Sequence, residues 1–123
     1  MILMMAVGIA GGVGAIGRYL TDGAIQDRSR GILPLGTMTV NVVGSFVMGV
    51  LGGFVLFHNA GTNAMAVIGT GFCGGFTTWS TASWETLRLF EDDAFGAGVV
   101  NAVGGIAGSI ATAGVGLLLA SVL

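Results

Sequence analysis

The chain has 123 residues, of which 54% are hydrophobic and only 8% are charged, and its mean hydropathy is +0.94. Soluble domains carry about a quarter charged residues, so this composition excludes a water-soluble globular protein and predicts a single-domain, all-α integral membrane protein in a lipid bilayer. The formal net charge of -2 and the absence of a basic stretch exclude nucleic acid as a partner. The single cysteine excludes an intrachain disulfide.

Four apolar segments follow one another along the chain, and each is long enough to cross a bilayer. The first is expected to be a retained helix and not a signal peptide, because no basic stretch precedes it. Small residues recur at helical spacing in the segments, and such residues let membrane helices approach closely. Polar loops are expected at Thr21–Pro34 and His58–Asn63. The predicted transmembrane helices cover residues 2–20, 35–57, 64–88 and 95–122.

The third segment contains an unusual window, Gly71–Ser83, with the sequence G-F-C-G-G-F-T-T-W-S-T-A-S. Glycine loosens the backbone, and hydroxyl groups can satisfy the amides and carbonyls that a broken helix leaves free. An uninterrupted membrane helix needs no such cluster. The window therefore predicts a discontinuous helix that is broken at mid-membrane, where such breaks usually bind an ion.

Two further polar residues lie inside apolar helices, and each has two readings. Asn41 is either a hydrogen-bonding contact between helices or a pore-lining donor for an anion. Arg18 either extends to the membrane interface or draws anions toward a vestibule. No nucleophile with a neighbouring base and no phosphate-binding loop is found, so we do not expect an enzyme.

Three blocks of the chain resemble the signature blocks of the Fluc/CrcB fluoride channels. They are G-G-V-G-A-I-G-R-Y at Gly11–Tyr19, G-T-M-T-V-N-V-V-G-S-F-V-M-G at Gly36–Gly49, and G-F-C-G-G-F-T-T-W-S-T at Gly71–Thr81. The blocks occur in the family's order across three of the four segments. The resemblance implies a fluoride-specific channel of the cell membrane. It also implies an antiparallel dimer of four-helix subunits around a central sodium ion that is structural and not transported.

The resemblance also assigns roles to individual residues. In the family, backbone carbonyls at the break of the third helix hold the sodium ion, and the matching positions are Gly74 and Thr77. Asn41 matches an asparagine on the fluoride route, and Ser109 matches a hydroxyl of the fourth helix. Arg18 matches the arginine of the first helix.

The chain departs from the family in the third block. The family usually has two phenylalanines, whose electropositive ring edges face the anion, at the positions of Trp79 and Ala82. Trp79 still offers a ring edge and an indole N–H, whereas Ala82 offers neither. The resemblance therefore places both residues on the fluoride pathway and predicts that this chain contributes an altered half of it.

The arginines are distributed unequally between the two ends of the four predicted helices. All of them lie on the side of the first and third loops, which predicts a fixed orientation with these loops in the cytoplasm. In an antiparallel dimer, a chain of fixed orientation needs a partner of opposite orientation. We therefore expect a heterodimer of this chain with a paralogue, and we expect the heterodimer to export fluoride passively. A homodimer with an altered pore is the alternative. The arginines are Arg18, Arg28, Arg30 and Arg88.

Two other classes remain open at this point. Small multidrug transporters also have four short helices, but they depend on a glutamate in the first helix, and no acidic residue lies between Met1 and Leu20. A non-conducting scaffold subunit is favoured if the changes at Trp79 and Ala82 have silenced transport.

Overall fold

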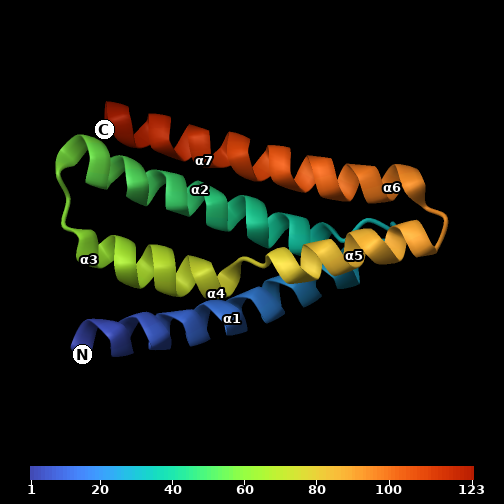
Figure 1. Cartoon of the computed structure of the whole chain (residues 1–123), viewed down its shortest axis with the longest axis horizontal. Coiled ribbons are helices and arrows are strands. Elements are labelled where there is room, and N and C mark those ends of the chain that lie inside the picture. The colour runs from blue at the N-terminus through green and yellow to red at the C-terminus, as the bar shows by residue number, and fades with distance from the viewer.

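The computed structural model describes all of residues 1–123 and consists of helices with no strand. The helices form four spans that run alternately back and forth (Figure 1), and the third is broken, as predicted. Three continuous helices, Ile2–Arg28, Leu35–His58 and Phe95–Val122, are long and apolar enough to cross a membrane, which agrees with the predicted all-α membrane fold. The first two spans are α1 (Ile2–Arg28) and α2 (Leu35–His58). The third comprises α3 (Thr62–Ala64), the π-helix η1 (Met65–Cys73), α4 (Gly74–Phe76) and α5 (Trp79–Glu91), and the fourth comprises α6 (Phe95–Val99), the π-helix η2 (Val100–Gly104) and α7 (Gly105–Val122).

The first helix is longer than the sequence predicted. The predicted end near Leu20 is wrong, because α1 continues to Arg28 and only Ser29–Pro34 forms the connection. Polar residues after Leu20 suggested a loop, but no proline interrupts them, and Arg28 Nη1 donates to the Ala24 carbonyl (3.0 Å) in the last turn. Hydropathy marks where the apolar run ends, near Leu20, but the helix continues for about two further turns of more polar residues to Arg28. The other helix bounds lie within three residues of the expected ones.

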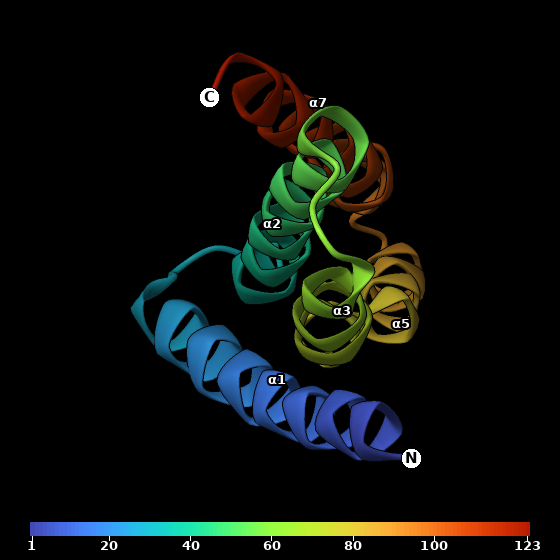
Figure 2. The same ribbon diagram turned by 90° about the vertical axis from the view of Figure 1, so that its left-hand side faces the viewer.

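Viewed along its axis, the protein is an open arrangement with α1 at one edge and α7 at the other (Figure 2). The α2 helix packs on α7, and the first half of the third span packs on α1. Only 17 of the 123 residues are buried, and many of the exposed side chains are large and apolar. Such an outer surface suits a hydrocarbon environment, in which the driving force for helix packing is close contact and not removal of apolar groups from water.

Glycines bring the backbones of neighbouring spans into contact at two places. Between α1 and the third span, a Cβ atom at Gly14 would overlap the carbonyl of Phe72, and one at Gly75 would overlap the carbonyl of Gly11. Between α2 and α7, a Cβ atom at Gly49 would overlap the backbone of Ala113. The first pair of contacts holds η1 and α4 against α1, and the second holds α7 against α2.

Candidate functional site

The break of the third span consists of two threonines with extended backbones. Thr77 has φ -86° and ψ 161°, and Thr78 has φ -152° and ψ 122°. The N–H and the hydroxyl of Thr77 both donate to the carbonyl of Cys73, at 2.9 and 2.8 Å, and so close the preceding helix. The hydroxyl of Thr78 accepts from the N–H of Thr81 (3.2 Å) and caps the start of α5. The threonines thus end one helix and begin the next within two residues.

The side chain of Asn41 on α2 binds the break directly. Its Oδ1 accepts from the N–H of Thr78 at 2.7 Å, and its Nδ2 donates to the carbonyl of Thr78 at 2.9 Å. Oδ1 of the carboxamide therefore takes the place of the carbonyl that the N–H of Thr78 would bind in a continuous helix, and Nδ2 adds a donor to the carbonyl that begins α5. Of the two readings from the sequence, the structure shows the helix-to-helix contact, and one N–H of the amide has no protein partner.

Four backbone carbonyls at the break, those of Gly74, Gly75, Phe76 and Thr77, lose the donors that a continuous helix would supply. In a continuous helix the N–H of Thr78 would bind the carbonyl of Gly74, and the N–H of Thr81 would bind the carbonyl of Thr77. Here the first N–H binds Asn41 and the second binds the hydroxyl of Thr78. Gly74 is exposed, and no atom of the surrounding spans lies within 4 Å of the position of its missing Cβ. The break therefore presents carbonyl oxygens that are free to accept from, or coordinate, a group outside the chain.

A cavity of about 180 Å³ lies beside the break. Arg18 lines it, and the Nε atom of this arginine is buried without a hydrogen-bond partner. Asp22, one turn further along α1, packs its carboxylate against Gly36 in the first turn of α2, where the helix dipole favours a negative charge. The remaining cavity wall is rich in hydroxyl groups, and the lining residues are Ala15, Arg18, Tyr19, Asp22, Thr37, Val40, Thr78 and Thr81.

The other predicted pathway residues are distributed around this centre. Trp79 occupies the first turn of α5 and is 72% exposed. Ala82 is half-buried, and its carbonyl accepts from Thr86 Oγ1 (2.8 Å) and from the side chain of Asn101 (3.3 Å). Ser109 is half-buried on α7, and its hydroxyl makes no hydrogen bond within the chain. The structure thus joins Asn41 to the break and places the Arg18 cavity beside it, whereas no hydrogen bond links Ser109 to either.

Two buried polar residues that contact α5 were not singled out from the sequence. Asn101 is 3% exposed and Thr37 is 1% exposed. Thr37 Oγ1 donates to Glu85 Oε1 at 2.9 Å and so links α2 to α5. Asn101 is the only asparagine of the fourth span. A lone amide in an apolar segment is the signal that identified Asn41, and it would have identified Asn101 as well.

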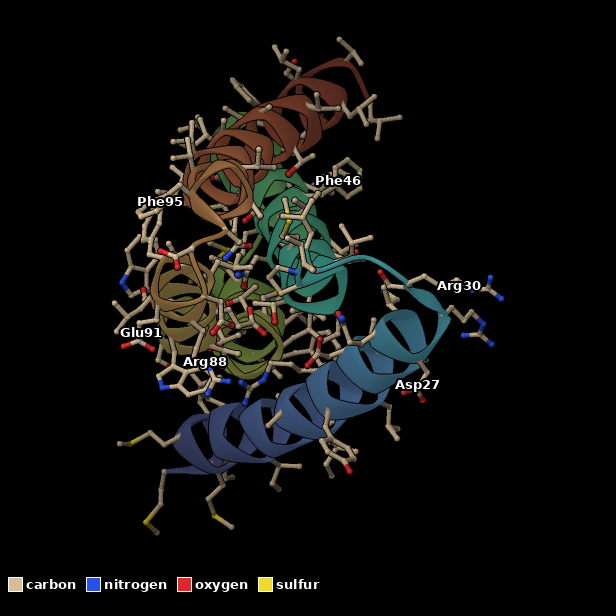
Figure 3. The ribbon with its side chains drawn as sticks, turned by 90° about the vertical axis from the view of Figure 1, so that its right-hand side faces the viewer. Asp27, Arg30, Phe46, Arg88, Glu91 and Phe95 are labelled. Atoms are coloured by element: carbon tan, nitrogen blue, oxygen red, sulfur yellow. The ribbon has the colours of Figure 1, made fainter.

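The charged residues gather at the end of the molecule that carries the first and third connections. Figure 3 views this end, with Arg30 and Asp27 projecting away from the bundle at the end of α1 and with Arg88 and Glu91 on α5. Both termini and the connection between α2 and α3 lie at the opposite end (Figure 1). Arg28, Arg30 and Arg88 therefore lie at this end, whereas Arg18, predicted at the end of the first helix, lies near the middle of α1 because that helix continues to Arg28.

Comparison with known proteins gives a consistent picture. Residues 5–117 match the family model described as CrcB-like protein, Camphor Resistance (CrcB). The chain is 42% identical over 118 residues to the fluoride-specific ion channel FluC 1 of Leifsonia xyli subsp. xyli, covering 96% of this chain and 86% of the relative. It is 40% identical over 119 residues to the fluoride-specific ion channel FluC 2 of Cutibacterium acnes, covering 96% of this chain and 97% of that one. These relatives are named as ion channels and not as enzymes.

Proposed function

The chain belongs to the CrcB family, and from this premise we propose that it is a subunit of a fluoride channel. Relatives named fluoride-specific ion channel are similar to it over 96% of its length. The observation that carries the proposal is the break at Thr77 and Thr78, where unwound backbone and an amide side chain meet between membrane-spanning helices. Irregular backbone at this depth is tolerated only where it lines a cavity or is buried in protein.

Fluoride is small and strongly hydrated, so a conducting route needs several weak donors in place of its water shell and no tight charged site. The proposed donors are the free N–H of Asn41, the ring edge or indole N–H of Trp79 and the hydroxyl of Ser109. Arg18 lies in the wall of the cavity beside the break, where its positive charge would attract anions. The proposed route itself then needs no charged side chain. Ala82 contributes the wall of the route without an aromatic edge.

We also propose that a structural sodium ion binds at the break. The carbonyls of Gly74 and Thr77 fit this role because their usual donors are diverted and because hard cations prefer oxygen ligands. Two carbonyls are too few for a sodium ion, so the matching carbonyls of a second, antiparallel subunit would complete the site. When bound, the ion would neutralise the negative ends of these carbonyl dipoles. Replacing sodium by a large organic cation is expected to lower the dimer fraction in detergent, measured by analytical ultracentrifugation.

The second subunit is proposed to be a paralogue of inverted orientation. The arginine-rich end of the molecule favours one orientation, with the first and third connections in the cytoplasm and both termini outside. The alanine at position 82 supports the same proposal, since a partner with an aromatic residue there would complete the pathway. A homodimer with two altered pathways is the alternative. Membership of the CrcB family replaces the small multidrug transporter considered from the sequence.

Fluoride efflux from liposomes tests the function and the pairing together. Three samples are compared: the chain alone, the chain with its paralogue, and the Asn41→Leu variant in place of the chain with the same paralogue. Fluoride release from the liposomes is followed with a fluoride electrode. Fast efflux only from the co-reconstituted pair supports the heterodimer, and robust efflux from the chain alone shows a homodimer. A pair that releases no fluoride, together with unchanged fluoride resistance in cells that lack the gene, would leave a non-conducting scaffold as the function.

A further inference from the structure

The fourth span contains a buried amide that lies against the distal half of the broken helix. Asn101 belongs to the π-helix η2, whose wider turn is a common feature of functional sites. Its side chain is 3% exposed, and its Nδ2 donates to Thr86 Oγ1 at 2.8 Å and to the carbonyl of Ala82 at 3.3 Å. Both acceptors belong to α5, and Ala82 is one of the residues proposed to border the fluoride route.

The chemistry of this cluster allows only one orientation of the amide. Thr86 Oγ1 uses its own proton to bind the carbonyl of Ala82 at 2.8 Å, so it can only accept from Asn101. Turning the amide around would place Oδ1 against two acceptors. In the observed orientation Oδ1 is buried and has no partner. A buried acceptor without a donor lowers stability, so the cluster is better explained by a role in positioning than by a role in stabilising the fold.

We propose that Asn101 is a positioning residue for anion selectivity, which sets the rotation of α5 through Thr86 and the carbonyl of Ala82. This proposal rests on the proposed channel function. On its other face α5 is tied to α2 through the Thr37–Glu85 hydrogen bond, so the two contacts together determine how the first turns of α5 are presented. The residues whose direction depends on this rotation are Trp79 and Ala82, which are assigned to the fluoride route.

We expect the hydrogen bonds of Asn101 to fix the rotation of α5, whereas the volume of the Asn101 side chain matters less. Leucine has the same branching as asparagine and no polar atoms, so Asn101→Leu removes both the hydrogen bonds and the unpartnered oxygen, although its methyl groups are bulkier. We therefore expect selectivity to fall by more than any loss of thermal stability in detergent explains, and Thr86→Val, which keeps the side-chain shape, should show the same fall. Asn101→Leu and Thr86→Val remove the same hydrogen bond from opposite ends. Their effects should therefore not add, because sites that act through one shared contact are coupled.

The experiment compares fluoride and chloride efflux from liposomes that contain the conducting complex. We expect the fluoride-to-chloride permeability ratio to fall about tenfold in Asn101→Leu and in Thr86→Val, and no further in the double variant. Thr86→Ser retains the hydroxyl and should keep the wild-type ratio. The matched control is Thr112→Val, which removes another hydrogen bond between the fourth span and a neighbour, from Thr112 Oγ1 to the carbonyl of Val42 (3.0 Å), but does not touch α5. It should also keep the ratio.

Unchanged ratios in Asn101→Leu and Thr86→Val, or effects that add in the double variant, would overturn the proposal. If Asn101→Leu does not fold, the Thr86→Val and Thr86→Ser pair decides alone. A second measurement separates this proposal from the channel function. In a Cys73→Ala background, the reaction rate of Ser80→Cys with a thiosulfonate reports the rotation of α5 even in a complex that does not conduct. We expect this rate to change about threefold in Asn101→Leu and Thr86→Val but not in Thr112→Val, and an unchanged rate would also overturn the proposal.

Discussion

The two halves of the broken third span are held in the protein by different kinds of contact. The proximal half, η1 and α4, lies against α1 through glycines whose backbones meet without intervening side chains, as at Gly14 and Gly75. The distal half, α5 with its N-cap Thr78, is attached by side-chain hydrogen bonds from two neighbouring spans, α2 and the fourth span. Their donors and acceptors are Asn41 with Thr78, Thr37 with Glu85, and Asn101 with Thr86.

This difference separates a rigid half from an adjustable one. Backbone contacts of the first kind leave no room for displacement, because even one added carbon atom would overlap a carbonyl group. Hydrogen bonds of the second kind allow small rotations, since their energy changes gradually with angle. The break lies where the two halves meet. The proximal half therefore locates the proposed ion sites, and the distal half orients the residues that an anion would pass.

The largest effect is expected from a side chain in the glycine contact. In Gly14→Val the new side chain would overlap the carbonyl of Phe72, and we expect a loss of about 3 kcal/mol or more and little folded protein. The folded fraction is measured by size-exclusion chromatography in detergent. Gly12→Val is the matched control, since no atom of a neighbouring span lies near its missing Cβ. If both variants were equally well folded, the glycine contact would not be what holds the proximal half.

A smaller effect is expected when the amide that bridges the break is removed. Asn41→Leu leaves the N–H of Thr78 without a partner and removes one of the donors to its carbonyl, and we expect a loss of about 2 kcal/mol in thermal stability together with loss of fluoride efflux. Thr39→Val serves as the control on the same helix, because the hydroxyl of Thr39 binds only the carbonyl of Leu35 within α2. A stable, fully conducting Asn41→Leu protein would contradict both the structural and the functional role of Asn41.

The contact between α2 and α5 should contribute less than the bridge at the break. Thr37→Val removes one hydrogen bond to Glu85 while keeping the shape of the buried side chain, so a loss of about 1 kcal/mol is expected. A double-mutant cycle with Glu85→Gln measures the coupling between the two residues in thermal melts. Strictly additive effects would mean that this hydrogen bond does not hold α5 in place.

The smallest effect is expected at Gly105 in the fourth span. No atom of a neighbouring element lies within 4 Å of the position of its missing Cβ, so Gly105→Ser should change stability by no more than about 0.5 kcal/mol. The new hydroxyl stands one turn before Ser109 and adds a donor to the proposed route, so fluoride efflux should stay equal or rise. Slower efflux with unchanged stability would indicate that this part of α7 does not border the route.

Much of the fold follows from the one-dimensional pattern. The lengths of the apolar runs predicted four spans, and the glycine, threonine and serine cluster at Gly71–Ser83 predicted the break, because both depend only on local composition. The end of α1 was wrong by eight residues for the same reason. Composition reports where a chain leaves the hydrocarbon region, while the helix itself continues until its backbone hydrogen bonds stop at Arg28.

The partners of the polar side chains could not be found in this way. Asn41 was recognised as unusual from the sequence, but its two readings differ only in what lies opposite it across the interface between α2 and the break. The same holds for Asn101, whose partners on α5 are brought near it by the turn between the third and fourth spans. Hydrogen bonds between helices depend on the relative rotation of the helices, which no local pattern encodes.

By itself, the sequence determined the class of protein, the number of spans and the place of the break, because these follow from hydropathy and from residues that cannot continue a helix. The tertiary structure alone decided how the break is satisfied. Asn41 and the hydroxyl of Thr78 replace the acceptors for the N–H groups of Thr78 and Thr81, and the carbonyls at the end of α4, including those of Gly74 and Thr77, lose their helical donors. The physical reason is that a buried polar group is satisfied by whichever donor the packing of the helices brings within reach, and glycine contacts between spans determine that packing.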